Sequence, residues 1–410
     1  MAEKAREYPE LRFQGFSGAW EKRKLSDISE KVTQKNTNNS FSEVFTNSAE
    51  RGIISQLDFF DKDIANQKNI SGYFIVKNDD FVYNPRISNL APVGPIKRNK
   101  LGRNGVMSSL YYIFRTHSIS PSFLEYYFEG TQWHYFMYLN GDTGARADRF
   151  AIKDSVFSTM PIFITSSSEQ IQIGSFFKSL DELITVNQRK LNELKKLKKA
   201  YLQKMFPKNG VSIPELRFAG FTTPWEKRKL GDVSDIQGGG TPDSKNQAYW
   251  SGDINWFTPT EVFNQGYLSE SRRKITKEGL LKSSATLMPP GTVLMTSRAG
   301  VGDMGILTQA AATNQGFQSM IPHKEMPSYL LYSMQFFISR MANKLASGST
   351  FMEISGKQLA KIEVMIPGDS QERELLCNFF KNLDDMITVN QRKLDKLKEL
   401  KKGYLQKMFI

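Results

Sequence analysis

Side chains of the types that contact nucleic acid gather in several short segments of the sequence. Arg, Lys, Asn and Gln read base edges, and Lys, Arg, Ser and Thr contact phosphates. The candidates in the first half are Lys97, Arg98, Lys100 and Arg103, which share one glycine-containing segment, and Arg146 and Arg149, which flank a glycine-bearing loop. The candidates in the second half are Thr241, Arg272, Arg273, Lys274, Ser297, Arg298, Asn314 and Gln315. Each has the alternative of a solvated or structural role, and we expect the set to include several DNA contacts.

Motifs for other kinds of chemistry are incomplete. The tetrapeptide Tyr83-Asn-Pro-Arg86 is similar to the Asn-Pro-Pro-aromatic motif of adenine methyltransferases, but arginine replaces the second proline and no glycine-rich cofactor loop accompanies it. Pro242-Asp243 lacks the Glu-x-Lys partner of a nuclease metal site. His117, His134 and His323 are scattered, and no GxxxxGK[ST] phosphate loop is present. We therefore expect no catalytic residue, metal site or cofactor in this chain.

Composition favours a polyanionic partner. The 410 residues carry 55 basic and 42 acidic side chains, which gives a net charge of +13, and the sequence pI is about 9.4. This excess favours nucleic acid over a membrane surface. No apolar run approaches the roughly 18 residues of a membrane span, so we expect no insertion into a membrane. The charged start MAEKAREYPE does not resemble a secretion signal, and the single Cys377 suits a reducing compartment. We expect a cytoplasmic protein.

The chain contains an internal repeat. Residues 9–29 (PELRFQGFSGAWEKRKLSDIS) and 214–234 (PELRFAGFTTPWEKRKLGDVS) agree at 15 of 21 positions, and residues 184–206 and 387–409 agree at 19 of 23. Between these matched blocks the sequence differs. We call residues 30–165 the first variable region and residues 235–368 the second. The repeat therefore predicts that each half consists of a variable globular region supported by the matched blocks, which we call the frame.

The second repeated block predicts a long helix in each half. Capping-box-like starts occur at Ser166-Ser-Ser-Glu169 and Asp369-Ser-Gln-Glu372, and hydrophobic residues then recur at heptad spacing. A helix from about Ser168 to Phe206 would be roughly 58 Å long. The residues predicted to pack the helix pair are Leu180, Leu183, Asn187, Leu194, Leu197 and Tyr201 in the first copy and Leu383, Met386, Asn390, Leu397, Leu400 and Tyr404 in the second.

The apolar stripe of each helix needs a partner, and the nearest is the other copy. We therefore predict an α+β protein in which two mixed α/β domains are separated by two long antiparallel helices that form an intramolecular coiled coil with pseudo-twofold symmetry. The predicted segments are a first recognition domain (1–165), a first helix (166–208), a second recognition domain (209–368) and a second helix (369–410). Asn187 and Asn390 either fix the helix register or lie at an exposed edge of the stripe.

The ordered set of motifs resembles the specificity subunits of type I restriction-modification systems over essentially the whole chain. It comprises the repeated PELRF…WEKRKL entrance, the repeated LD…ITVNQRKL…YLQKMF helix, and, in the second variable region, GGGTP…YW, TSRAGVG and ATNQGF. Residues 30–120 lack the first two of these second-region motifs, so the contact residues of the first domain are less defined by the resemblance.

The resemblance implies a non-catalytic subunit whose two target-recognition domains each read one half of a bipartite, asymmetric sequence in double-stranded DNA. It further implies that the helices set the spacer. Its implied partners are two methyltransferase subunits, which use S-adenosylmethionine to methylate adenine, and two restriction-translocase subunits, which use ATP and Mg.

Two other classes of protein remain as alternatives. A coiled-coil scaffold that binds two unrelated proteins would share the repeat, but it would show little salt-dependent DNA affinity. A self-sufficient DNA-modifying enzyme would need a cofactor site, and the sequence contains no recognisable one.

Overall fold

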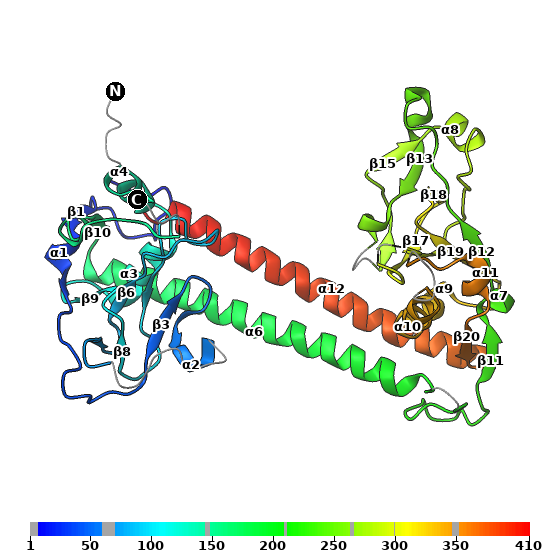
Figure 1. Cartoon of the computed structure of the whole chain (residues 1–410), viewed down its shortest axis with the longest axis horizontal. Helices are drawn as coiled ribbons and strands as arrows, with labels where there is room; N and C mark the ends of the chain where they lie inside the picture. Colours follow the sequence, from blue (N-terminus) through cyan, green and yellow to red (C-terminus); the bar gives the residue numbers. More distant parts are fainter. Residues whose placement is uncertain are drawn as a thin grey trace. The chain divides into compact units, whose positions relative to one another are not determined.

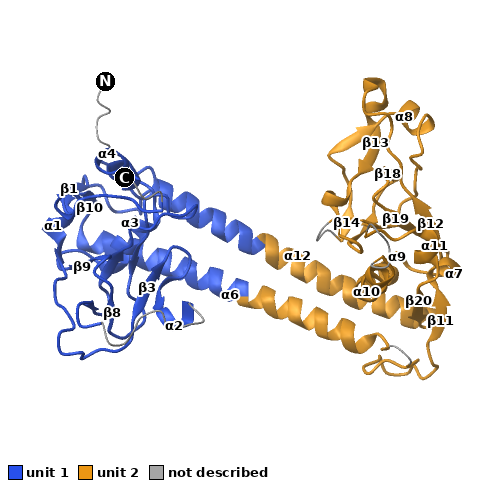
Figure 2. Cartoon of the chain, in the orientation of Figure 1, with its two compact units in different colours: residues 1–188, 393–410 blue, residues 189–392 orange. Residues whose placement is uncertain are grey.

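The computed structural model describes residues 7–59, 70–143, 148–208, 211–262, 266–298, 300–346 and 352–410. The chain divides into two compact units, residues 1–188 with 393–410 (unit 1) and residues 189–392 (unit 2), coloured blue and orange in Figure 2. Helices α6 (Ser167–Met205) and α12 (Ser370–Lys407) each contribute a segment to both units. None of the described helices is both long and apolar enough to cross a membrane.

Unit 1 is built from short antiparallel strands covered by helices. Its strands are β1 Glu21–Lys24, β2 Ser29–Lys31, β3 Phe45–Ser48, β4 Gly52–Ser55, β5 Phe74–Val76, β6 Phe81–Tyr83, β7 Ile96–Arg98, β8 Gly105–Met107, β9 Tyr112–Thr116 and β10 Pro161–Ile164. Its short helices are α1 Leu25–Ile28, α2 Gln56–Phe59, α3 Pro121–Glu129, α4 His134–Asn140 and α5 Asp154–Phe157. The largest described sheet has the order β2-β9-β6-β7, and three two-stranded sheets pair β1 with β10, β3 with β4 and β5 with β8.

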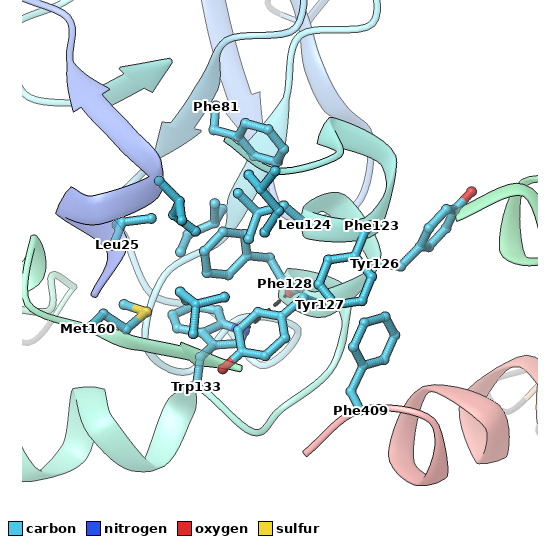
Figure 3. Packing of buried hydrophobic residues seen from close by; sticks show 14 of the residues in the cluster. Leu25, Phe81, Phe123, Leu124, Tyr126, Tyr127, Phe128, Trp133, Met160 and Phe409 are labelled. Atoms are coloured by element: carbon cyan, nitrogen blue, oxygen red, sulfur yellow. Dashed lines mark hydrogen bonds between the residues drawn. The ribbon is translucent and has the colours of Figure 1, made fainter. Parts of the chain in front are cut away.

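The core of unit 1 is aromatic and closes around the end of the chain. Phe409, just after α12, lies 5.3 Å from Phe123 of α3 and 5.8 Å from Phe177 of α6 between ring centroids. Trp20 packs against the same ring at 6.2 Å. Figure 3 shows Phe409 pointing from the α12 end toward Phe123 and Tyr127. The repeated YLQKMF ending thus supplies a buried anchor for the recognition domain.

Unit 2 contains two larger sheets. Its strands are β11 Glu226–Lys229, β12 Ser234–Gly238, β13 Trp250–Phe257, β14 Tyr267–Leu268, β15 Arg273–Ile275, β16 Val293–Met295, β17 Met304–Leu307, β18 Ala311–Thr313, β19 Gln318–Pro322 and β20 Glu363–Ile366. Its short helices are α7 Leu230–Val233, η2 Gln247–Tyr249, η3 Pro259–Glu261, α8 Lys277–Leu281, α9 Ser328–Ser333, α10 Gln335–Ala346 and α11 Gly356–Ala360. The sheet orders are β12-β19-β16-β17-β14, β15-β13-β18 and β11-β20.

The two predicted long helices form, and short apolar segments of the variable regions supply strands. Residues 73–76, 80–83 and 292–296 contain β5, β6 and β16. Both long helices start and end within a few residues of the predicted positions. The segment that follows β19 forms two helices, α9 and α10, which are separated at the buried Met334.

The repeated entrance block forms the same support in both units. β1 pairs antiparallel with β10, and β11 pairs in the same way with β20. Arg12 donates its Nε and Nη2 groups to the carboxylate of the buried Glu169, at 2.7 Å each. Arg217 donates the same two groups to the buried Glu372, at 2.6 and 2.7 Å. Trp20 and Trp225 are both 3% exposed, so these tryptophans are buried parts of the frame.

Only half of each predicted capping box forms. The Ser166 hydroxyl accepts the Glu169 amide at 3.4 Å, and the Asp369 carboxylate accepts the Glu372 amide, also at 3.4 Å. The glutamate side chains do not reach back to the cap, because the arginines hold them. The glutamate in each motif therefore ties the helix start to the entrance block.

The two long helices pack antiparallel within each unit. In unit 1, Lys401 of α12 bonds to Asp181 of α6 and Glu129 of α3, both at 2.6 Å. In unit 2, Lys198 of α6 bonds to both oxygens of Asp384 of α12 at 2.5 and 2.7 Å. Each residue of the first helix pair corresponds to one 203 positions later, as Asp181 does to Asp384 and Lys198 to Lys401. The contacts therefore repeat with the pseudo-twofold symmetry that the sequence predicts.

Some of the residues predicted to pack between the two helices are buried or half-buried, and others are exposed. Leu180 and Leu383 are buried as expected, and Leu194, Leu397, Tyr201 and Tyr404 are half-buried. Leu183, Leu197, Met386 and Leu400 are 41–52% exposed, so their predicted place in the interior is wrong. Leu191 and Leu394, each 1% exposed, and the half-buried Lys198 and Lys401 hold interior positions instead. The two candidate stripes are one residue apart, and both contain leucines.

Asn187 is 6% exposed, whereas Asn390 is half-buried. Each donates its side-chain amide to the carbonyl four residues earlier in its own helix, at 2.7 Å. These bonds satisfy the amides locally, whereas Lys198 and Lys401 bond across to the other helix.

Candidate nucleic-acid interface

The glycine-rich loop of the second variable region is held against two tryptophans. Trp256 donates its indole N–H to the Gly240 carbonyl at 2.9 Å, and Trp250 donates to the Asp243 carbonyl at 3.1 Å. A Cβ on Gly239 would lie 1.9 Å from the Asn314 carbonyl oxygen, and one on Gly240 would lie 2.2 Å from the Ser284 backbone. Only glycine permits this close approach, so the loop positions the residues that follow it.

Arg273 lies on this tryptophan surface. It sits opposite Trp256 in the β13–β15 pair, and these strands and α8 neighbour one another in unit 2 (Figure 1). Its guanidinium carbon is 3.6 Å from the centre of the Trp250 ring and 5.5 Å from that of Trp256. Arg272 is also exposed, and Lys274 is half-buried with Glu270 at 3.8 Å. The three predicted basic residues thus differ in how firmly they are held.

Thr241 and Gln315, both predicted contacts, come together on the surface. The Thr241 hydroxyl donates to the Gln315 side-chain oxygen at 2.5 Å, and both residues are exposed. Asn314 is half-buried and its side-chain oxygen accepts the Gly316 amide at 2.9 Å. Thr241 and Gln315 are therefore available to a ligand, whereas the Asn314 oxygen supports its own turn.

The predicted pair Ser297-Arg298 does not form a shared contact surface. Ser297 has no exposed surface, and its hydroxyl has no hydrogen-bond partner within the described part of the chain. The expectation that Ser297 contacts DNA is wrong, because its backbone is bonded to both Gly316 and Ile354 and its side chain faces the interior. Arg298 is half-buried and forms a backbone bridge with Glu353.

The basic segment of the first variable region is largely engaged by carboxylates. Arg98 bonds to Glu125 at 2.8 Å, and Lys100 bonds to the same carboxylate. Arg103 makes a two-pronged pair with Glu43 at 2.7 and 2.8 Å. Lys97 is half-buried on β7. Three of these four cations therefore also brace their own domain.

Of the second predicted pair in the first half, Arg146 and Arg149, the structure describes only Arg149. Arg149 is half-buried and forms a backbone bridge with Arg86, whose guanidinium is 3.8 Å from Asp148. Arg146 lies outside the described residues. This arrangement leaves unit 2 as the source of the better-defined candidate surface.

Several charged residues that the sequence analysis missed have structural roles. Asp80 is buried, and its carboxylate accepts hydrogen bonds from Nε and Nη2 of Arg115 at 2.7 and 2.9 Å. Burial lowers the pKa of Lys401, but the carboxylates of Glu129 and Asp181 outweigh this effect and raise it. The signal that could have predicted the cross-helix roles of Lys198 and Lys401 was a lysine at an interior position of the heptad pattern.

No group of three potential metal ligands occurs among the residues that the structure describes.

In sequence, the chain is similar to DNA specificity subunits of type I restriction enzymes. A family model described as the type I restriction modification DNA specificity domain matches residues 222–399. The chain is 32% identical to the MjaIX specificity subunit of Methanocaldococcus jannaschii over 190 residues, which are 45% of this chain and 44% of that one. It is 26% identical to the EcoR124I/EcoR124II specificity subunit of Escherichia coli over 174 residues, 40% of this chain and 42% of that one. The alignments thus span less than half the length of these relatives.

Solved structures share the fold over nearly the whole chain. The type I S subunit from M. genitalium aligns with a TM-score of 0.62 and 13% identity over 98% of this chain and 99% of that one. A chain from a type I restriction-modification assembly aligns with a TM-score of 0.57 and 16% identity over 95% and 97% of the two chains. In sequence, residues 222–399 match the type I restriction modification DNA specificity domain, and over nearly the whole chain the fold is that of these two solved structures.

Proposed function

We propose that this chain is the DNA-reading subunit of a type I restriction-modification complex, in which each variable region recognises one half of a bipartite, asymmetric target. The observation that carries this proposal is the combination of matched frames with different variable regions. The same ion pair, strand pair and tryptophan support each unit, while the sheets that they carry differ. Such a design holds two different recognition surfaces in equivalent settings.

The helix pair would set the spacer between the half-sites. Both α6 and α12 contribute to both units, and their cross-helix contacts repeat at an offset of 203 residues. Lys198–Asp384 and Lys401–Asp181 resist sliding of one helix along the other, because a shift of one turn would separate these charges. We propose that this helix register is what sets the length of the spacer.

The pseudo-twofold frame also suits two copies of one partner, because equivalent surfaces bind identical subunits equivalently. The partners we propose are two methyltransferase subunits that use S-adenosylmethionine to methylate adenine. Two restriction-translocase subunits that use ATP and Mg would complete the assembly. This chain supplies the sequence specificity and none of the reacting groups.

The test is a genome-wide map of adenine methylation in cells with and without this gene, with the native methyltransferase expressed in both. Loss of one bipartite motif on deletion, and its return on complementation, would support the proposal. An unchanged map with the methyltransferase present would contradict it and favour a scaffold role. A companion measurement is DNA affinity of the assembled complex, which should fall steeply between 50 and 200 mM salt, that is, by ~10³-fold or more for six or more phosphate contacts.

A further inference from the structure

We propose that Arg273 is a specificity-determining residue that reads a guanine in the half-site of the second variable region. This inference rests on the proposed function and deepens it by assigning one side chain to one base. It comes from the way the guanidinium is held rather than from its charge alone.

One hydrogen bond and two aromatic contacts hold the Arg273 side chain in place. The Asp243 carbonyl fixes the Trp250 indole, and the Trp250 ring lies 3.6 Å beneath the Arg273 guanidinium carbon. Trp256 buttresses Trp250 at 5.1 Å with an interplanar angle of 85°. A guanidinium on an aromatic face keeps its plane fixed and loses little further freedom when it binds.

The backbone of Arg273 is equally constrained. The Ser271 hydroxyl donates to the Arg273 carbonyl at 2.6 Å and accepts the Trp256 amide at 2.9 Å. Ser271 is 8% exposed, so this link lies beneath the surface on which the guanidinium sits. The strand end and the ring are therefore fixed together.

The N–H groups of Arg273 remain available. Arg98, Arg103 and Arg115 of unit 1 direct their N–H groups to Glu125, Glu43 and Asp80. Arg273 is exposed, and in the described part of the chain no carboxylate lies within ion-pair distance of it. An aromatic face holds the cation without using its hydrogen-bond donors.

Guanine is the base that this arrangement fits. Its O6 and N7 are adjacent acceptors in the major groove, and the planar fork of arginine bonds to both. Lysine carries the same charge but has a single rotatable ammonium, so it lacks the fork. A phosphate can accept the same fork, but a phosphate contact would not depend on the base at any one position of the target. Loss of preference at a single base position, rather than equal loss on all targets, thus separates base reading from phosphate binding.

The experiment uses the full chain with its native methyltransferase and compares wild type with Arg273→Lys, Arg273→Ala and Trp250→Leu. The matched control is Lys282→Ala, which removes an exposed charge at the end of α8 outside the predicted contact set. Methylation rates are measured on DNA targets that carry each of the four bases at every position of both half-sites. Circular dichroism confirms that each variant is folded.

We expect Arg273→Lys and Arg273→Ala to lower the preference for guanine at one position of one half-site by about tenfold to a hundredfold. Trp250→Leu should weaken the same preference, and Lys282→Ala should change nothing. Equal loss on all targets, or full retention of guanine preference in Arg273→Lys, would overturn the inference. If wild type itself shows no bipartite preference, the proposed function fails instead, so the two failures are distinguishable.

Discussion

The ion pair between Arg217 and Glu372 gives the sharpest prediction about stability. Glu372 is 1% exposed, and its carboxylate accepts two N–H groups of Arg217 and, at 3.3 Å, the indole N–H of Trp225. Replacing Arg217 by methionine keeps much of the side-chain volume and removes the guanidinium. The carboxylate is then left in the interior without its cation.

The expected cost is about 3–5 kcal/mol, because removing one partner of a buried pair leaves an uncompensated charge. Changing Glu372→Gln in the same chain removes that charge and keeps an acceptor for Trp225. The double variant should therefore recover about 2 kcal/mol relative to Arg217→Met alone. The control is Arg228→Met, since the Arg228–Glu226 pair is 47% and 59% exposed and should contribute less than about 1 kcal/mol.

Urea unfolding followed by circular dichroism and tryptophan fluorescence measures these differences. The corresponding Arg12→Met change should affect unit 1 in the same way, because Glu169 has no exposed surface. If Arg217→Met costs no more than Arg228→Met, burial of the carboxylate is not what makes this pair important, and the reasoning is refuted.

Three further predictions concern the loop, the thiol and the helices. Gly240→Ala should destabilise unit 2 by about 1–3 kcal/mol in urea unfolding because its Cβ would overlap the Ser284 backbone, whereas Gly238→Ala, with its nearest neighbour at 3.8 Å, should cost less than about 1 kcal/mol. Burial raises the pKa of Cys377 to about 11 from 9.0, so at pH 8 the thiolate population, and with it the rate of reaction with a disulfide reagent, should be about a hundredfold lower than after unfolding. Inserting one heptad into both long helices adds ~10 Å, which should lengthen the spacer of the methylated motif by about three base pairs and leave both half-sites unchanged; an unaltered spacer in a folded variant would count against the helix pair as its determinant.

Repetition and periodicity made the frame predictable from sequence. The matched blocks indicated two equivalent supports, and the heptads located α6 and α12. The choice of interior stripe was not predictable in the same way, because Leu183 and Leu197 fit a heptad as well as Leu191 does. Lys198 occupies an interior position only because Asp384, 186 residues away, neutralises it there.

The candidate interface shows the same limit. Arg98, Lys100 and Arg103 have the composition of a DNA-binding segment, yet Glu125 and Glu43, distant in sequence, hold them. Ser297 stood next to an arginine in a motif, but strand pairing turned it inward. Arg273 was one of several equivalent cations in the sequence, and only the fold places it on Trp250.

Under the proposed function, each variable region reads its half-site independently of the other. The most direct measurement is the methylation map of a chain in which residues 30–160 are replaced by residues 235–362, so that both frames carry residues 235–362 of the second variable region while β10 and β20 stay in place. Because the helices run antiparallel, the account predicts a motif with two copies of one half-site in inverted orientation and with the original spacer. A folded, active hybrid that still methylates the original asymmetric motif would contradict it.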